Sequence, residues 1–234
     1  THPNSTNKNR RLRIGYVSGD FRRHSVSFFL EPVLAQHNGE SFEIFCYSNH
    51  YIEDDMTRRL KEYAHGWRSI HNVHVDYAVQ MIRDDGIDIL VDLSGWTEHN
   101  GLSIFARRPA PVQVTWLGGL NTTGLQSINY RIVDTYTDPA GTSDHYHTET
   151  LWRMPDSFLV YQPFTEAPEV APLPAIETGT ITFGSFNSFA KMTPAVIKLW
   201  SALMKAVPTS RLLLKTIGLD EPEQQQRIDR KSGV

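Results

Sequence analysis

Residues 87–95 read IDILVDLSG, an almost continuous apolar run that ends at Ser94 and Gly95. A strand of a parallel sheet has this pattern when helices cover both faces of the sheet. Other strand-like runs occupy residues 11–18, 42–48, 111–118 and 130–134. Strands and helices that alternate at this spacing predict an α/β fold with a parallel sheet and right-handed crossovers.

Three segments between these strands have the features of helices. They span residues 26–37, 52–64 and 75–86. The third is amphipathic and ends at Gly86, a residue type that suits a helix C-terminus. Pro32 lies inside the first segment, where it is a poor fit unless the helix tolerates a kink.

Three loops directly follow predicted strands and carry polar residues or glycines. They are Ser18–His24, Ser94–Asn100 and Gly118–Gly124. Ligands of parallel α/β sheets bind beyond the carboxyl ends of the strands. We therefore expect all three loops to line the same edge of the sheet.

The bulk composition excludes several classes of protein. The chain has 234 residues, a net charge of −3 and no long basic run, which argues against non-specific nucleic-acid binding. Its only cysteine, Cys46, lies in a strand-like run, and we expect it to be a buried and inert thiol. A single cysteine suits a reducing compartment, and no apolar run reaches the length of about 18 residues that a membrane span needs.

Residues 1–11 are polar and lack the apolar core of a signal peptide, so we predict a disordered start and a cytoplasmic protein. The chain begins with Thr1 and ends abruptly in RKSGV. Both ends lead us to expect a piece of a longer protein.

The composition changes after residue 161. Residues 162–178 contain four prolines and no helical or alternating pattern, which predicts a linker or a wrapping segment. Beyond it, residues 181–186 and 210–216 are strand-like, and Thr193-Pro194 is a good start for the helix between them. This β-α-β order predicts the start of a second parallel unit.

The common nucleotide and hydrolase motifs are absent. The sequence has no G-x-G-x-x-G after a strand, no P-loop, no G-x-S-x-G and no Asp-x-Asp pair for a metal-held diphosphate. Residues 144–149, DHYHTE, place two histidines and two acids together, but zinc requires a further ligand. We expect a polar loop there and no metal site.

The loop after the first strand carries Asp20, Arg22, Arg23 and His24. A neutral imidazole can take a proton from a hydroxyl or donate a hydrogen bond to a sugar, and Asp20 can orient it or act as the base. The arginines can meet phosphate. The alternative is a capping and turn segment with solvated arginines.

Two further segments are candidates for ligand binding. Glycines 118, 119 and 124 would let backbone N–H groups approach a ligand closely, although an ordinary glycine turn explains them equally well. Lys191 lies between a strand and a capped helix, where a diphosphate is often bound. A lysine there is more often only a solvated charge.

Taken together, seven blocks of this sequence resemble the catalytic region of the O-linked N-acetylglucosamine transferases, in the bacterial branch of the SPINDLY type. In chain order they are RIGYVSGDFRRHSVSFFLEPVL, FEIFCYS, DGIDILVDLSGWT, RPAPVQVTWLG, YRIVD, ETLWRMPDSFLVY and TFGSFNSFAKMTP. The resemblance extends from about residue 11 to about residue 216 and keeps the order of the blocks.

The resemblance implies a GT-B glycosyltransferase with two Rossmann-like lobes and an active site in the cleft between them. It divides the chain into the polar start 1–11, an N-terminal catalytic lobe 12–161, a Pro-rich linker 162–179 and the truncated start of a nucleotide-binding lobe 180–234. It also implies inverting transfer of N-acetylglucosamine from UDP-N-acetylglucosamine to Ser or Thr hydroxyls of proteins, without a metal or other cofactor. TPR repeats would precede this region in the parent chain.

Residue by residue, the resemblance places His24 and Asp20 on the family's candidate catalytic residues. Leu117 and Gly118 match the pair that lines the sugar pocket, and Lys191 matches the lysine that contacts the diphosphate. Ser188 and Ala190 depart from the family pattern, which favours the alternative of a non-catalytic GT-B-like interaction domain. Another GT-B enzyme, such as a sugar-nucleotide epimerase, is the remaining alternative.

Overall fold

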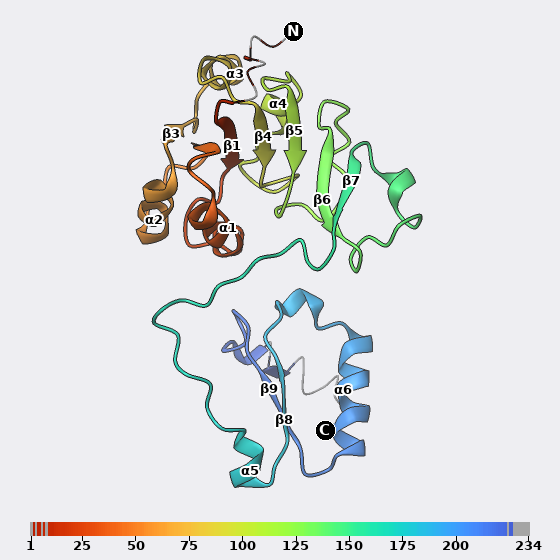
Figure 1. Cartoon of the computed structure of the whole chain (residues 1–234). Helices are drawn as coiled ribbons and strands as arrows, with labels where there is room; N and C mark the ends of the chain where they lie inside the picture. The colour runs from red at the N-terminus through yellow and green to blue at the C-terminus, as the bar shows by residue number, and fades with distance from the viewer. Residues whose placement is uncertain (1, 3, 6, 8, 224, 227–234) are drawn as a thin grey trace. The chain divides into compact units, whose positions relative to one another are not determined.

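The computed structural model describes residues 2, 4, 5, 7, 9–223, 225 and 226. The chain forms two compact units, Thr1–Phe164 and Thr165–Val234, which are drawn in Figure 1. Within the described residues, no helix is long and apolar enough to cross a membrane.

The first unit is built on a seven-stranded sheet whose strands are all parallel. The strands are β1 (Leu12–Ser18), β2 (Phe42–Ser48), β3 (Gly66–Ser69), β4 (Ile89–Asp92), β5 (Val112–Thr115), β6 (Tyr130–Asp134) and β7 (Thr150–Met154). Their order in the sheet is β3-β2-β1-β4-β5-β6-β7. The chain therefore builds outward in one direction from β1 and in the other from β4, and the order reverses between these two strands.

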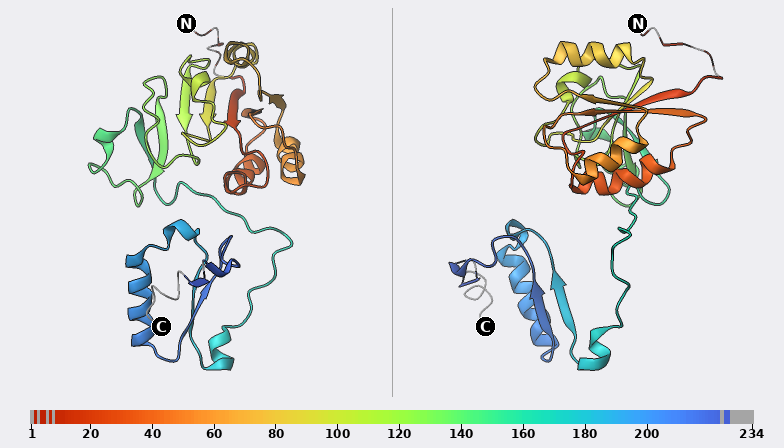
Figure 2. Two further views of the ribbon diagram at one scale, coloured as in Figure 1. Left: turned by 180° about the vertical axis from the view of Figure 1, so that it is seen from behind. Right: turned by 90° about the vertical axis from the view of Figure 1, so that its left-hand side faces the viewer.

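Helices cover both faces of this sheet, as the right-hand view of Figure 2 shows. One face carries α1 (Ser25–Gln36) and α2 (Asp55–Tyr63), and the other carries α3 (Val75–Asp84) and α4 (Leu102–Phe105). A 3₁₀ turn, η1 (Asp144–Tyr146), lies between β6 and β7. Because both faces are covered, the central strands are largely buried, and their few polar residues, such as Asp92 and Gln113, are buried with them.

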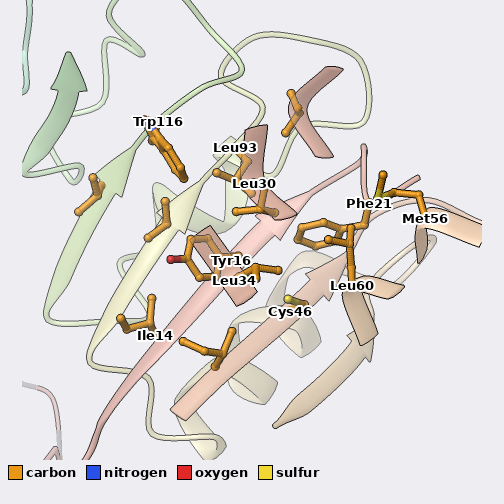
Figure 3. Packing of buried hydrophobic residues seen from close by; sticks show 14 residues of the cluster. Ile14, Tyr16, Phe21, Leu30, Leu34, Cys46, Met56, Leu60, Leu93 and Trp116 are labelled. Atoms are coloured by element: carbon orange, nitrogen blue, oxygen red, sulfur yellow. The ribbon is translucent and has the colours of Figure 1, made fainter. Parts of the chain in front are cut away.

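The two faces of β1 enter two different apolar layers. Tyr16 packs in the layer beneath α1 and α2, whereas Val17 packs in the layer beneath α3 and α4. Figure 3 shows the first layer, in which Leu30 and Leu34 of α1 lie over Tyr16, and Cys46 of β2 lies close to Leu60 of α2. Burial strongly raises the pKa of the Cys46 thiol, so it behaves as an apolar side chain, as expected.

Pro32 lies inside α1 and does not end it. The helix begins after its N-cap His24 and continues to Gln36, and Pro32 is buried. The predicted helices and the five predicted strands are confirmed, although β4 covers only four residues of the run at 87–95.

The predictions lack two edge strands and two short helices. One of these helices, α5 (Pro174–Thr178), lies inside the predicted linker 162–179. β3 reads GWRS and β7 reads TLWRM, and neither shows a clear alternation. Both lie at the edges of the sheet, where Trp152 is 60% exposed, so their hydrogen-bonding ladder rather than an apolar pattern defines them. The helix α4 has only four residues, which is too short for a periodic signal.

The structure describes contacts in part of the polar start, and the disorder expected for residues 1–11 stays a prediction. Asn4 and Arg10 both donate hydrogen bonds to the carboxylate of Asp88, at 2.7 Å and 2.6 Å. Asp88 directly precedes β4 and also accepts from the backbone N–H of Arg13 at 2.9 Å. Residues 1, 3, 6 and 8 of the predicted disordered start lie outside the described residues.

In the second unit the structure describes a pair of parallel strands with helical segments before and between them. Its elements are α5 (Pro174–Thr178), β8 (Thr182–Ser185), the 3₁₀ turn η2 (Phe189–Lys191), α6 (Pro194–Ala206) and β9 (Arg211–Leu214). The side chain of Thr193 accepts a hydrogen bond from the N–H of Val196 at 3.4 Å, as the Thr-Pro pair predicts. Ile197 is the buried side chain of α6, whereas Leu199 is 68% exposed.

Leu90 lies in the central strand β4 and is fully buried, so we expect its truncation to weaken the first unit strongly. Leu90→Ala should lower the free energy of unfolding by about 2–5 kcal/mol, because it removes buried methyl groups and leaves a cavity. Urea unfolding followed by tryptophan fluorescence measures this change. The matched control is Leu120→Ala, at a side chain that is 81% exposed, and a similar loss in both variants would contradict the assignment of the core.

Candidate functional site

The three strand-end loops meet at one pocket, as their positions in the sequence predict. The pocket has a volume of about 230 Å³ and lies where the strand order reverses, which is the usual ligand position in such sheets. Its lining residues are Asp20, His24, Ser25, Val26, Phe29, Thr97, Leu117, Gly118, Leu120, Phe158 and Leu159. The structure thus brings four of the five predicted site residues together.

His24 is held at the start of α1, beside Asp20. Its Nδ1 accepts a hydrogen bond from the backbone N–H of Val26 at 3.3 Å and lies 3.6 Å from Oδ2 of Asp20. The side chain of His24 is 37% exposed, whereas that of Asp20 is only 10% exposed. Because Nδ1 faces the helix backbone and Asp20, Nε2 is the ring nitrogen that remains for a ligand.

The backbone around Asp20 is fixed from two sides. Its N–H donates to the hydroxyl of Ser18 at 2.9 Å, and its carbonyl accepts from the hydroxyl of Ser27 at 2.6 Å. Arg22 donates to the Asp20 carboxylate at 3.3 Å. Asp20 is therefore an ionisable group held in a defined position at the wall of the pocket.

The two arginines of this loop have different environments. Arg23 donates from its side chain to Asp55 at 2.7 Å and 3.0 Å, and from its backbone N–H to Asp54 at 2.7 Å. Arg23 thus ties the loop to the start of α2 and is paired with an acid, whereas the alternative in the sequence analysis was a solvated arginine. Arg22 lies against Asp20, and its Nε is buried without a hydrogen-bond partner in the described part of the chain.

The pair Leu117-Gly118 forms a strained turn at the end of β5. Leu117 has a φ of +67°, and the N–H of Gly118 donates back to the carbonyl of Trp116 at 2.9 Å, which defines a three-residue turn. Such a conformation costs a residue with a side chain about 1–3 kcal/mol and persists only where its surroundings fix it. At Gly118, a Cβ would overlap the carbonyl oxygen of Leu93, so the close approach of the two loops requires glycine.

Asp92 fixes the neighbouring loop after β4. It is fully buried and accepts hydrogen bonds from Ser94 N–H at 3.1 Å, from Gly95 N–H at 2.9 Å and from the hydroxyl of Thr115 at 2.8 Å. Burial raises the pKa of this carboxyl group, and its hydrogen bonds oppose the shift. A single side chain therefore joins the ends of β4 and β5.

Two buried charged residues that the sequence interpretation missed hold the loop after β5. Arg131 of β6 donates to the carbonyl of Gly119 at 2.7 Å and to that of Asn121 at 2.5 Å. Glu149 accepts from the N–H of Thr123 at 2.8 Å, from its hydroxyl, and from the hydroxyl of Thr122 at 2.7 Å. The available signal for Arg131 was a charged residue between Tyr130 and Ile132 in a buried strand.

The segment DHYHTE does not gather its acids and histidines around one point. Asp144 pairs with Arg153 at 2.8 Å, whereas Glu149 faces the threonines of the loop after β5. Among the described residues, no three His, Cys, Asp or Glu side chains are placed to hold a metal ion.

Lys191 belongs to the second unit, where it is exposed in the turn η2 that precedes α6. A pocket of about 690 Å³ lies at the carboxyl ends of β8 and β9, lined by Phe186, Ser188, Phe189, Lys215, Thr216 and Ile217. The role of Lys191 at a diphosphate stays a prediction.

Residues 1–165 match the model of the family "Glycosyl transferase family 41". The chain is 46% identical over 216 residues to a probable UDP-N-acetylglucosamine–peptide N-acetylglucosaminyltransferase SPINDLY of Petunia hybrida. It is 47% identical over 210 residues to the corresponding protein of Oryza sativa subsp. japonica. These matches cover 91% and 88% of this chain, which spans only 23% and 22% of the length of those curated relatives.

A solved structure supports the same grouping. The chain is 41% identical to a mutant of the O-GlcNAc transferase of Thermobaculum terrenum, with a TM-score of 0.90. The match covers 97% of this chain and 43% of that one. The predicted fold class, α/β of the GT-B type, is confirmed.

Gly118→Ala tests the close approach of the loops after β4 and β5. Because the added Cβ would overlap backbone atoms of Leu93 and Ser94, we expect a loss of about 1–3 kcal/mol in the free energy of unfolding. Gly39→Ala is the control, since a Cβ there meets no atom within 4 Å. Urea unfolding of both variants measures the effect, and equal stabilities would show that the two loops do not pack as described.

Glu149 should contribute stability that depends on pH. Burial alone would raise its pKa, but hydrogen bonds from Thr123 and Thr122 outweigh burial and lower the pKa below its usual value of 4.5. A lowered folded-state pKa gives stability that is present above pH 4.5 and is lost as the pH falls through the folded-state pKa.

Glu149→Gln should therefore lower the unfolding free energy at neutral pH by about 1–3 kcal/mol, and this difference from the wild type should shrink in acid. Urea unfolding at several pH values measures it, with the exposed Glu62→Gln as control. A difference that stays constant from neutral to acidic pH would contradict the role of the Glu149 carboxylate.

Proposed function

Because this chain belongs to glycosyl transferase family 41, we propose that it is part of an enzyme that transfers N-acetylglucosamine from UDP-N-acetylglucosamine to Ser or Thr hydroxyls of proteins. The observation that carries the proposal is the pocket in which Asp20, His24, Leu117 and Gly118 meet. Relatives whose names state this activity match this chain over 91% and 88% of its length.

The proposed reaction is a direct displacement at the anomeric carbon of the sugar. The acceptor hydroxyl oxygen forms the new bond to this carbon while the bond from the carbon to the diphosphate oxygen breaks, and UDP leaves with the electron pair. The configuration at the anomeric carbon inverts, and the hydroxyl proton passes to a base. No metal or cofactor takes part in this proposal.

Asp20 and His24 are proposed to act on the acceptor hydroxyl: His24 positions it by a hydrogen bond, and Asp20 receives its proton. The imidazole Nδ1 accepts from Val26 N–H, so the neutral ring carries its proton on Nε2 and can donate a hydrogen bond there. The Asp20 carboxylate lies within 3.6 Å of the ring and stands ready to accept a proton or to orient the imidazole.

Leu117 and Gly118 are proposed to hold the sugar, and Lys191 to stabilise the charge that develops on the departing UDP. The strained turn at Leu117 presents backbone at the pocket wall, and Gly118 lets this turn pack closely against the backbone of Leu93. A lysine beside a leaving diphosphate lowers the barrier by electrostatic stabilisation.

The partners follow from the same proposal. The enzyme would bind UDP-N-acetylglucosamine and a protein acceptor, would act in the cytoplasm, and would carry TPR repeats outside the region described here. It would bind neither nucleic acid nor a membrane.

His24→Ala should reduce kcat/KM for protein glycosylation by about ten- to a thousandfold, because it removes a group that acts in the transition state. His74→Ala is a close control, since His74 also caps a helix and accepts from the backbone at 3.3 Å, yet lies outside the pocket. Lys191→Ala should cause a loss of similar size. Its control is Lys198→Ala, at an exposed lysine of α6. Transfer of labelled sugar by the full-length protein measures all four variants.

A panel of donors tests the proposal itself. Transfer of sugar from UDP-N-acetylglucosamine to protein supports the proposal. A preference for another nucleotide sugar would contradict the proposed donor but would leave the proposed transfer to a protein hydroxyl in place. Release of a changed free sugar without any acceptor would indicate an epimerase. Failure to bind any nucleotide sugar would support the non-catalytic interaction domain.

A further inference from the structure

The turn at Leu117 requires support from the surrounding structure. Its φ of +67° is unfavourable for a residue with a side chain, so neighbouring groups must hold it in place. Leu117 and Gly118 line the pocket, and any relaxation of the turn would move the pocket wall. The groups that hold the following residues, 119–124, therefore control the shape of the site.

Two buried charged side chains supply this support from behind the loop. Arg131 is 5% exposed and binds two carbonyl oxygens of the loop, those of Gly119 and Asn121. Glu149 is 4% exposed and binds Thr122 and Thr123. Arg131 thus holds carbonyl oxygens of the loop, which accept hydrogen bonds. Glu149 holds N–H and hydroxyl groups of the loop, which donate them.

The bond from Arg131 to Gly119 also orients the peptide that lines the pocket. In a trans peptide the carbonyl and the N–H point in opposite directions. An arginine that binds the Gly119 carbonyl therefore directs the N–H of Leu120 away from itself. Leu120 is one of the residues that line the pocket.

Arg131 is costly to bury, which argues against a role in filling space. Its Nε is buried without a hydrogen-bond partner in the part of the chain that the structure describes. Burial lowers its pKa, and Asp138, Glu149 and Asp92 oppose that shift. An apolar side chain would fill the same space without a desolvation cost, whereas only a planar guanidinium reaches two carbonyls at fixed angles.

We propose that Arg131 and Glu149 are positioning residues that hold the strained Leu117–Gly124 loop in the geometry that binds the sugar of the donor. The inference rests on the proposed function. The pair acts through the loop backbone and does not touch the reacting atoms.

Arg131→Met in the full-length protein tests the inference, with Arg153→Met as the matched control. Arg153 lies on the neighbouring strand β7 and also makes two bonds, to the carbonyl of Asp138 at 2.6 Å and to Asp144 at 2.8 Å, but none to the loop. We expect Arg131→Met to raise KM for UDP-N-acetylglucosamine or to lower kcat by about ten- to a hundredfold. Its affinity for UDP alone should stay within about twofold of the wild type, because the loop holds the sugar.

A second variant guards against a folding defect in Arg131→Met. Thr122→Ala removes one contact to Glu149 from a side chain that is only partly buried, and Thr142→Ala is its control in an exposed loop. Thr122→Ala should shift the donor KM in the same direction by a smaller factor. Arg131→Lys should recover part of the activity, since lysine keeps the charge and can reach one carbonyl.

The outcomes separate the two proposals. If the wild type is active and Thr122→Ala, together with any folded Arg131→Met, behaves like the controls, the inference is wrong and the proposed function stands. Equal losses of affinity for UDP and for UDP-N-acetylglucosamine also contradict it, because they indicate a general defect. A wild type that neither binds nor uses a nucleotide sugar contradicts the proposed function, and this inference with it.

Discussion

Parallel strands require every connection to return across a face of the sheet, so all their carboxyl ends meet at one edge. In the first unit this constraint acts together with the reversal of strand order between β1 and β4. The loops that follow these two strands leave toward opposite faces, and the space between them becomes the pocket. The position of Asp20 and His24 is thus a consequence of the topology.

The pocket depends on polar groups that never reach its surface. Asp92 joins the ends of β4 and β5, and Arg131 and Glu149 hold the loop that follows β5. Each of these groups is buried, and each makes hydrogen bonds to backbone atoms of a loop. A strained turn at Leu117 is compatible with a stable protein because these bonds leave it no alternative position.

The sequence was sufficient to predict the sheet, its covering helices and the meeting of three loops, because these depend on apolar runs and on strand order. It was insufficient for β3 and β7, since edge strands are defined by backbone pairing and carry no apolar alternation. Arg131 and Glu149 were missed for another reason. Their roles depend on contacts with residues 10 to 27 positions away, which no local pattern encodes.

Cys46 offers a practical consequence of the packing beneath α1 and α2. It is the only cysteine among the 234 residues, and it is completely enclosed within the first unit. A thiol reagent can therefore modify the chain only when that unit opens. The rate of labelling at Cys46 measures the opening of the sheet that carries the pocket. This rate does not change with fluctuations that are confined to the second unit.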